Sequence, residues 1–176
     1  MPASRSKFFM CSGPRVRNAP VVLRAQVTRA YSGGGTEVEM NPEMQRRRLA
    51  EARVGRLATV GATGDPHVVP VCFVLDGDAI YWAVDHKPKA SQRLRRLANI
   101  EAHPVAELVV DHYTEEWNQL WWVRVSAAAA VLEPGTETER ALDLLAAKYE
   151  QYRERRPAGP VVRMMPRRWS GWSASA

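Results

Sequence analysis

The feature that most constrains the fold is a hairpin signal in the first half of the chain. A nearly continuous apolar run covers residues 67–75, the triplet Asp76-Gly77-Asp78 ends it, and a second apolar run covers residues 79–84. Glycine flanked by aspartate is typical of the tight turn that joins two antiparallel strands. The two runs are therefore predicted to form a β-hairpin.

The rest of the chain after residue 40 alternates strand and helix patterns. Strands are expected at residues 54–60, 105–113, 120–132 and 161–172, and helices at residues 42–53, 90–102 and from 136 onward. Short turns join most neighbouring strands, and few connections cross over. This order predicts a mainly β protein, a small β-barrel with helices at its ends.

The first and last of these helices have recognisable N-terminal residues. Asn41 can cap the free N–H groups, Pro42 suits the first helical position, and Glu43 faces the positive end of the helix dipole. In the last helix, Thr136 and Glu139 are spaced as a capping box. Its apolar side chains recur on one face, which is expected to be buried: Ala141, Leu142, Leu145, Tyr149 and Tyr152.

The first 40 residues differ in charge from the rest. They carry six Lys and Arg against two Glu, a net charge of +4, which leaves only +2 of the chain's +6 for residues 41–176. They show no hydrophobic period, so we assign them no fold. Residues 1–40 are interpreted as a disordered or mis-annotated leader, with a transit peptide or a functional tail as alternatives, and residues 41–176 as one folded domain.

Composition argues against several classes of protein. The two cysteines, Cys11 and Cys72, lie in unlike settings, which argues against a disulfide framework and favours a cytoplasmic protein. No apolar run approaches the roughly 18 residues that a membrane span needs. The small net charge of residues 41–176 argues against a nucleic-acid partner.

No set of residues forms a self-sufficient active site. The four histidines do not recur at metal-ligand spacings with Cys or carboxylates, so no metal is expected. Cys72 lies in an apolar strand and is interpreted as a small core residue. Asp111 and His112 are adjacent in a strand and point to opposite faces. We predict no catalytic side chain, and an enzyme built on this chain needs a bound cofactor.

One segment could bind an anion. It begins in a loop and continues into a helix, and its polar residues are Lys87, Lys89, Ser91, Arg93, Arg95 and Arg96. Free N–H groups at a helix N-terminus, together with converging cationic side chains, suit a phosphate group. A solvated basic helix face is the alternative for the same pattern.

Proline and tryptophan residues in the predicted strands indicate where these strands could contact a ligand or a partner. Pro70 lies inside a predicted strand, where it implies an edge, a bulge or the approach of a ligand, because proline cannot donate to the ladder. Four tryptophans suit a ring-binding groove, a dimer contact or the core: Trp121, Trp122, Trp169 and Trp172.

Several segments, in this order and spacing, resemble the pyridoxamine-phosphate-oxidase-like split β-barrels. They are residues 55–60 (GRLATV), 64–71 (GDPHVVPV) and 76–81 (DGDAIY), then Lys87-Pro88-Lys89, residues 94–100 (LRRLANI), His103-Pro104 and residues 107–113 (ELVVDHY). Trp117 and residues 120–125 (LWWVRV) resemble the actinobacterial branch assigned to the deazaflavin coenzyme F420. The resemblance covers residues 41–172 and implies a split β-barrel like that of FMN-binding proteins.

The resemblance also implies a cofactor site shared between two copies of the chain. Members of the family are typically homodimers with a flavin or deazaflavin in a groove between subunits. By position, Lys87 and Lys89 bind the cofactor phosphate, with Ser91 or Arg95 assisting. The residues along the ring are Val69, Pro70, Val71 and Cys72, and Val110 and Asp111 approach from the other side.

The resulting hypothesis is an F420-dependent oxidoreductase that transfers hydride between the deazaflavin and a small organic substrate. The alternatives are an FMN-dependent oxidoreductase of the same fold and a flavin- or haem-binding protein without turnover. The segments lack a full set of contacts for pyridoxamine phosphate, so vitamin B6 oxidation is not expected. The expected partners are a small-molecule substrate and a second copy of the chain.

Overall fold

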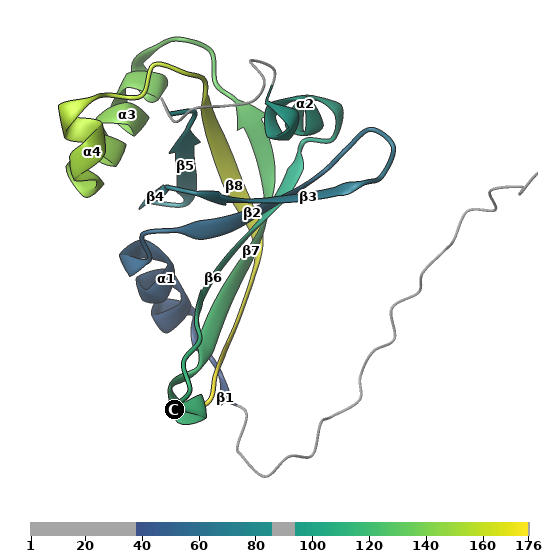
Figure 1. The fold of residues 1–176 in the computed structure, drawn as a ribbon, viewed down its shortest axis with the longest axis vertical. Coiled ribbons are helices and arrows are strands. Elements are labelled where there is room, and N and C mark those ends of the chain that lie inside the picture. Colours follow the sequence, from purple (N-terminus) through teal and green to yellow (C-terminus); the bar gives the residue numbers. More distant parts are fainter. Residues whose placement is uncertain (1–37, 86–93, 176) are drawn as a thin grey trace, which may run out of the picture. The chain divides into compact units, whose positions relative to one another are not determined.

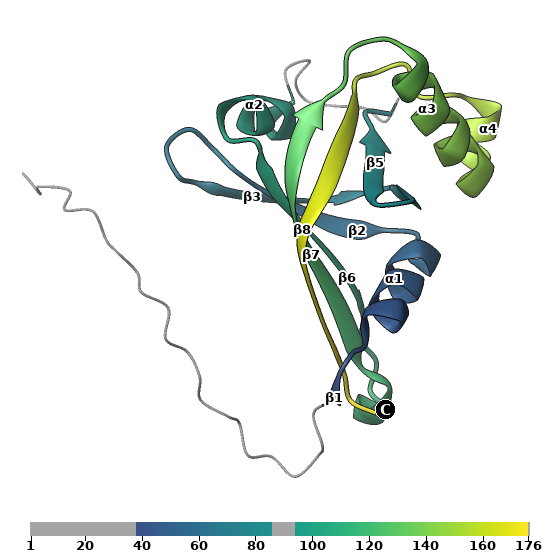
Figure 2. The same cartoon turned by 180° about the vertical axis from the view of Figure 1, so that it is seen from behind.

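The computed structural model describes residues 38–85 and 94–175, which form one antiparallel sheet and its helices. The strands are β1 (Val38–Glu39), β2 (Gly55–Val60), β3 (Pro66–Val71), β4 (Val74–Asp76), β5 (Ala79–Ala83), β6 (Val105–His112), β7 (Trp121–Val131) and β8 (Val161–Ser173). The helices are α1 (Pro42–Glu51), α2 (Arg95–Ala102), α3 (Thr136–Lys148) and α4 (Glu150–Glu154), with a 3-10 turn at Trp117–Gln119. Figures 1 and 2 show their arrangement from two sides.

The sheet has the order β3-β2-β6-β7-β8-β5-β4, and β1 pairs with β8. Every pairing is antiparallel, and the sheet curls so that its inner face encloses the core. The mainly β fold and the split β-barrel are therefore confirmed. None of the helices in the described part of the chain is long and apolar enough to span a membrane.

The predicted hairpin is present, but the run at residues 67–75 forms two strands rather than one. Gly77, at φ 55°, makes the turn between β4 and β5. The run breaks at Cys72 and Phe73, between β3 and β4. The Phe73 N–H donates to the Tyr149 hydroxyl over 3.0 Å, so this backbone is held by a side chain of the last helical region instead of by a ladder. The break lets the chain pass from one edge of the sheet to the other.

The core lies on the inner face of the sheet and is closed by α1 and α2. Leu57, Phe73, Trp82 and Leu108 are fully buried there. Asn99 of α2 donates to the Thr59 hydroxyl over 3.0 Å, and both residues are buried. The Asn41 side chain caps α1 by accepting from the Met44 N–H over 2.8 Å, as predicted.

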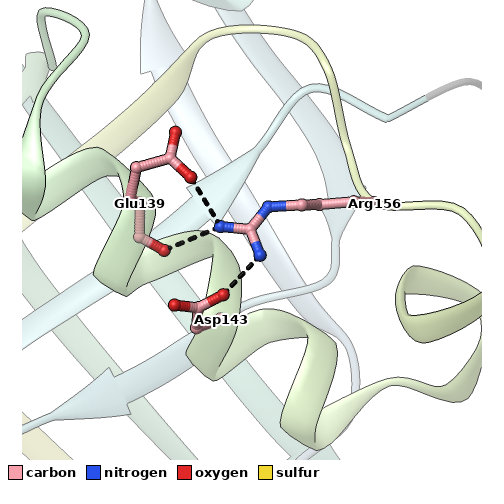
Figure 3. A network of polar contacts seen from close by, with 3 residues as sticks. All are labelled: Glu139, Asp143 and Arg156. Atoms are coloured by element: carbon pink, nitrogen blue, oxygen red, sulfur yellow. Dashed lines mark hydrogen bonds and ion pairs between the residues drawn. The ribbon is translucent and has the colours of Figure 1, made fainter.

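A second cluster lies on the outer face, where α3 packs on β4, β5 and β8. The apolar stripe predicted for this helical region is buried: Ala141, Leu142, Leu145, Tyr149 and Tyr152. Arg156, which follows α4, donates to the Glu139 carboxylate over 2.8 Å and also pairs with Asp143 (Figure 3). These contacts hold the segment after α4 against α3.

Three details at the ends of elements differ from the sequence prediction. The capping box is wrong: Gly135 is the N-cap of α3 and Thr136 is already helical, without a side-chain cap. The stripe spans two helices, because Tyr149 has an extended backbone at φ -119° and ψ 119° and separates α3 from α4. At the N-terminal side, β1 pairs with β8 and Met40 is buried, so the sheet includes residues that the prediction placed in the leader.

Candidate functional site

The outer face of β3, β2, β6 and β7 is left open by the helices of the described part. Strand register places Arg56 opposite Pro70 and Ala58 opposite Val68, so these side chains share that face. Val68 is 60% exposed and Val105 is 43% exposed. An apolar surface of this kind is what a partner or a ligand covers.

A groove of about 390 Å³ lies on this open face. Its lining is mostly apolar and comes from three strands and Arg167: Ala58, Thr59, Val60, Val105, Ala106, Glu107, Ser126, Ala127 and Arg167. The Glu107 carboxylate accepts from the Ser126 hydroxyl over 2.6 Å and lies 3.9 Å from the Arg124 guanidinium. The groove therefore combines an apolar floor with charge at its border.

Basic side chains converge where β3 begins and α2 begins. Burial lowers the pKa of His67, and the nearby Arg95 and Arg96 guanidinium groups lower it further. The His67 Nδ1 and Arg96 Nε atoms are buried and have no hydrogen-bond partner among the described residues. The Arg96 guanidinium lies over the Trp82 ring, 5.4 Å from its centroid. We name His67, Arg95 and Arg96 the basic cluster; it suits an anion.

The basic cluster adjoins the segment that carries the predicted phosphate ligands. Lys87, Lys89 and Ser91 lie outside the described residues, which resume at Leu94, one residue before α2. On the other side of the gap, Asp85 accepts from the Tyr152 hydroxyl over 3.2 Å. The sequence prediction for these three residues stays a prediction, and Arg95 lies beside His67 and Arg96.

The predicted ring-contact residues fall on two faces of the sheet. Val71 and Val110 are buried in the inner core, and Val69 packs against that core. Their side chains therefore point away from the open face, and only their backbone can reach a ligand there. Pro70 is exposed on β3, which among the described strands pairs only with β2 and is thus an edge strand, as its proline suggested.

Asp111 and Cys72 lie on the outer side of the sheet. Asp111 is half-buried and pairs with Arg56 at 3.6 Å. Cys72 is a half-buried free cysteine that lines a pocket of about 320 Å³ with Arg53, Tyr149 and Tyr152 among its neighbours. The pKa of Tyr152 is raised by burial first, then by Cys72 and Asp85. Cys72 thus packs under the helices rather than in the inner core.

The four tryptophans singled out in the sequence are all half-buried. Trp121 and Trp169 pack against the inner core. Arginines lie over three of the rings: Arg48 over Trp121 at 4.7 Å, Arg46 over Trp169 at 5.6 Å and Arg124 over Trp122 at 5.8 Å from the centroids. These contacts cover one face of each of these three rings.

Sequence reasoning missed the part that His67 and Trp82 play beside the arginines. His67 was considered only as a metal ligand, and Trp82 was simply part of a strand. Their meeting with Arg95 and Arg96 depends on how α2 closes the end of the barrel, which no local pattern reports. Within residues 38–85 and 94–175, no group of three or more His, Cys, Asp or Glu could hold a metal ion.

A curled antiparallel sheet closed by α1 and α2, with α3 on one side of its outer face, is the split β-barrel class. The family model described as pyridoxamine 5'-phosphate oxidase matches residues 40–173. The chain therefore belongs to this family. A search of curated proteins found no match.

Solved structures share the fold at low sequence identity. A conserved hypothetical protein from Mycobacterium tuberculosis matches with a TM-score of 0.63 and 17% identity, over 77% of this chain and 86% of that one. An FAD-binding protein from Mesorhizobium loti matches with a TM-score of 0.62 and 19% identity, over 80% and 99%. HutZ, a haem storage protein from Vibrio cholerae, matches with a TM-score of 0.54 and 20% identity, over 74% and 92%. Identities this low show the fold alone.

Proposed function

We propose that the chain is an oxidoreductase that binds a flavin-type cofactor, and that this cofactor is the deazaflavin F420. The observation that carries the proposal is the basic cluster, which lies on the inner side of the sheet where α2 begins, next to the edge strand β3. It offers an anion site beside a strand whose outer edge pairs with no described strand. Membership of the family and the FAD-binding structural neighbour support a flavin-type cofactor.

The residues present fit the phosphate of such a cofactor. The buried Arg96 Nε and His67 Nδ1 atoms lack partners among the described residues, and a buried polar atom without a partner is costly. Lys87, Lys89 and Ser91 lie just before Arg95 and Arg96 in sequence, and Arg95 is part of the basic cluster. We assign these four residues to the phosphate, with Arg96 and His67 in support.

The edge strand β3 fits the polar border of the ring. An edge strand presents backbone N–H and C=O groups that no neighbouring strand uses. In β3 these include backbone groups from Val69 to Val71, and Cys72 follows directly. In this proposal, Asp111 and the backbone of Val110 approach the ring from the later strand. When bound, the cofactor supplies hydride transfer, and a proton from solvent balances the reduction of a small organic acceptor.

The choice of F420 over FMN rests on the resemblance of Trp117 and residues 120–125 to the F420-dependent branch. Titration of the purified protein with each cofactor tests it. We expect the blue fluorescence of the deazaflavin to change at lower concentration than the yellow FMN signal does. Tighter binding of FMN would move the protein to the FMN-dependent alternative. A Soret band with haem and no binding of either flavin would support the binding protein without turnover.

We further propose that the partner is a second copy of the chain. The open face has the apolar residues expected of an interface, and its ion pairs Arg56–Asp111 and Arg124–Glu107 give it both signs of charge. A two-fold interface must be complementary to itself, and a face with mixed charge meets that need. Light scattering at micromolar concentration is expected to give twice the chain mass, and a monomer that still binds cofactor would contradict the shared site.

The phosphate assignment predicts the effect of Lys89→Ala. A charge-assisted hydrogen bond contributes about 1.5–3 kcal/mol, so cofactor affinity should fall roughly 10- to 100-fold. Added salt should weaken cofactor binding by the wild type more than by the variant, because salt screens the contact between Lys89 and the phosphate, which only the wild type makes. Fluorescence titration measures both effects.

The matched control is Arg155→Ala, which removes one exposed cation after α4, and it should bind like wild type. Lys87→Ala and the double variant extend the series. If the double variant keeps full affinity for every flavin tested, the lysines do not bind the phosphate. Arg95 and Arg96 are then the next candidates.

A further inference from the structure

The connection between β6 and β7 carries two strongly exposed aromatic side chains. Tyr113 is 66% and Trp117 is 77% exposed, the two highest values among the large hydrophobic residues that the structure describes. Glu115 and Glu116 lie between them and are also exposed. We name residues 113–119 the acidic tip. An exposed tryptophan is a candidate for a protein contact, because tryptophan is enriched among the residues that contribute most to binding at the centre of interfaces.

The apolar groove lies toward the opposite end of the same strands. Val105 is the first residue of β6 and lines the groove, whereas His112 ends β6 just before the acidic tip. Seven residue steps along a strand separate them, about 23 Å. Figure 1 shows β6 and β7 running from the α2 end of the sheet to the end where β8 finishes.

The two ends differ in charge. The acidic tip has two carboxylates and no basic residue. At the groove end, Arg167 lines the groove and Arg168 is exposed next to it, against one carboxylate, Glu107, which lies 3.9 Å from Arg124. The groove end therefore has more arginines than carboxylates, whereas the acidic tip has carboxylates alone.

We infer that the acidic tip of one copy docks into the groove of a second copy, with Trp117 filling the groove and Glu115 and Glu116 facing Arg167. This inference rests on the proposed homodimer and adds its geometry. A two-fold axis across the strands brings each tip to the other copy's groove. An axis along the strands would bring tip to tip and arginine to arginine, and like charges in contact cost several kilocalories.

The groove and the basic cluster lie on opposite faces of the same two strands. Thr59 of the groove lining pairs in register with His67, but its side chain is buried and accepts from Asn99 on the inner side. The docked Trp117 therefore covers the outer side of β2, and the basic cluster stays on the inner side.

The test uses two variants that each break both contacts of the dimer. Trp117→Ser removes the aromatic side chain, and Val105→Glu places a carboxylate in the groove against Glu115 and Glu116. Each is expected to weaken self-association on the order of 100- to 1000-fold in Kd, because a hot-spot residue is lost twice. Both sites are substantially exposed in the single chain, so the fold should be retained in both, as checked by circular dichroism.

Mixing the two variants gives the decisive result. A mixed dimer pairs an intact groove from Trp117→Ser with an intact Trp117 from Val105→Glu, so it recovers one of the two contacts. Mass photometry of the mixture should therefore show more dimer than either variant alone. The matched controls are Asn118→Ser in the tip and Ala147→Glu on the exposed side of α3, and both should associate like wild type.

Two outcomes overturn the inference. One is a wild-type dimer that Trp117→Ser leaves intact, and the other is a mixture that associates no better than its components. Either result leaves the proposed function standing if the protein without substitutions still binds a flavin in the titration. If the protein binds no flavin but the mixed variants still associate as expected, the proposed function is rejected and the inferred interface stands.

Discussion

The outer face of the sheet has two halves, one covered by a helix of the chain and one exposed. Over β4, β5 and the start of β8, α3 packs so that Tyr81 is 8% and Leu145 is 0% exposed. Over β3, β2, β6 and β7, outward side chains such as Val68 stay exposed. The chain uses its own helix to bury one half, and the other half stays exposed in the single chain. Outward apolar residues therefore belong to a core in the first half and to an open surface in the second.

The strand sequences already encode this difference. Every residue of β5 (AIYWA) is buried, which is the pattern of a strand covered on both faces. In β2, residues alternate between buried and more exposed positions, which is the pattern of a strand covered on one face. A strand that is apolar at every position therefore indicates a helix above it, and an alternating strand indicates a face that no helix of the described chain covers.

The largest expected effect is loss of a side chain from the covered half. Leu145→Ala removes a fully buried leucine from the cluster under α3 and should lower the free energy of unfolding by about 2–5 kcal/mol. Val68→Ala, on the open half, should change it by no more than about 0.5 kcal/mol. Urea unfolding of the two variants measures the contrast. Equal losses would mean that the open half is as well packed as the covered one.

A smaller effect is expected from loss of the Tyr149 hydroxyl, which links the end of α3 to Phe73 at the break between β3 and β4. The Tyr149 hydroxyl accepts from the Phe73 N–H and lies 2.7 Å from the Phe73 carbonyl and 2.8 Å from the Arg53 carbonyl. Tyr149→Phe leaves these buried backbone groups without their partner and should cost about 1–3 kcal/mol in urea unfolding. Tyr113→Phe, an exposed hydroxyl in the acidic tip, is the control and should cost nothing measurable. An unchanged Tyr149→Phe variant would show that water replaces the hydroxyl.

The smallest expected effect is the change with pH in the contribution of Lys148 to stability. Lys148 is the last residue of α3 and contacts the end of α1. Its ammonium donates to the Ala50 and Ala52 carbonyls, while burial lowers the pKa of Lys148 to about 8, below its usual 10.5. At pH values between about 8 and 10.5, Lys148 is deprotonated in the folded protein and still protonated in the unfolded chain. Stability should therefore rise with pH through this window.

The comparison of wild type with Lys148→Met isolates this contribution. Urea unfolding at pH 7, 8.5 and 10 should show the wild type gaining stability relative to the variant as pH rises. The gain is modest, because the side chain is partly exposed and its charge is partly screened. A difference that stays constant across the three pH values would show that Lys148 keeps its proton.

The sequence predicted the fold well because its signals were local. Asp76-Gly77-Asp78 predicted a hairpin, Asn41 predicted a cap, and the stripe on residues 141–152 predicted a buried face; each is present. The capping box failed because Gly135 took the cap position, one residue before Thr136. The single strand at residues 67–75 failed because an apolar run does not show where a distant hydroxyl takes over its hydrogen bonds.

The candidate site was harder to predict because it is made by contacts between distant segments. The alternation of β3 and β6 could have shown that Val71 and Val110 point inward, since their neighbours Pro70 and Asp111 point outward. The basic cluster could not be found this way. His67 and Arg96 are separated by two strands and meet only when α2 closes the barrel.

The position of β8 in the sheet has a consequence for biosynthesis. It is the last strand in the sequence, yet it lies between β7 and β5 and is the only described strand that joins the two halves of the sheet. It also pairs with β1, so Val38 meets Ser173. Contacts between such distant residues form slowly, because a long loop must close first. The nascent chain therefore leaves β7 and β5 with open edges until β8 has been made, and assembly of the barrel must follow its synthesis rather than accompany it.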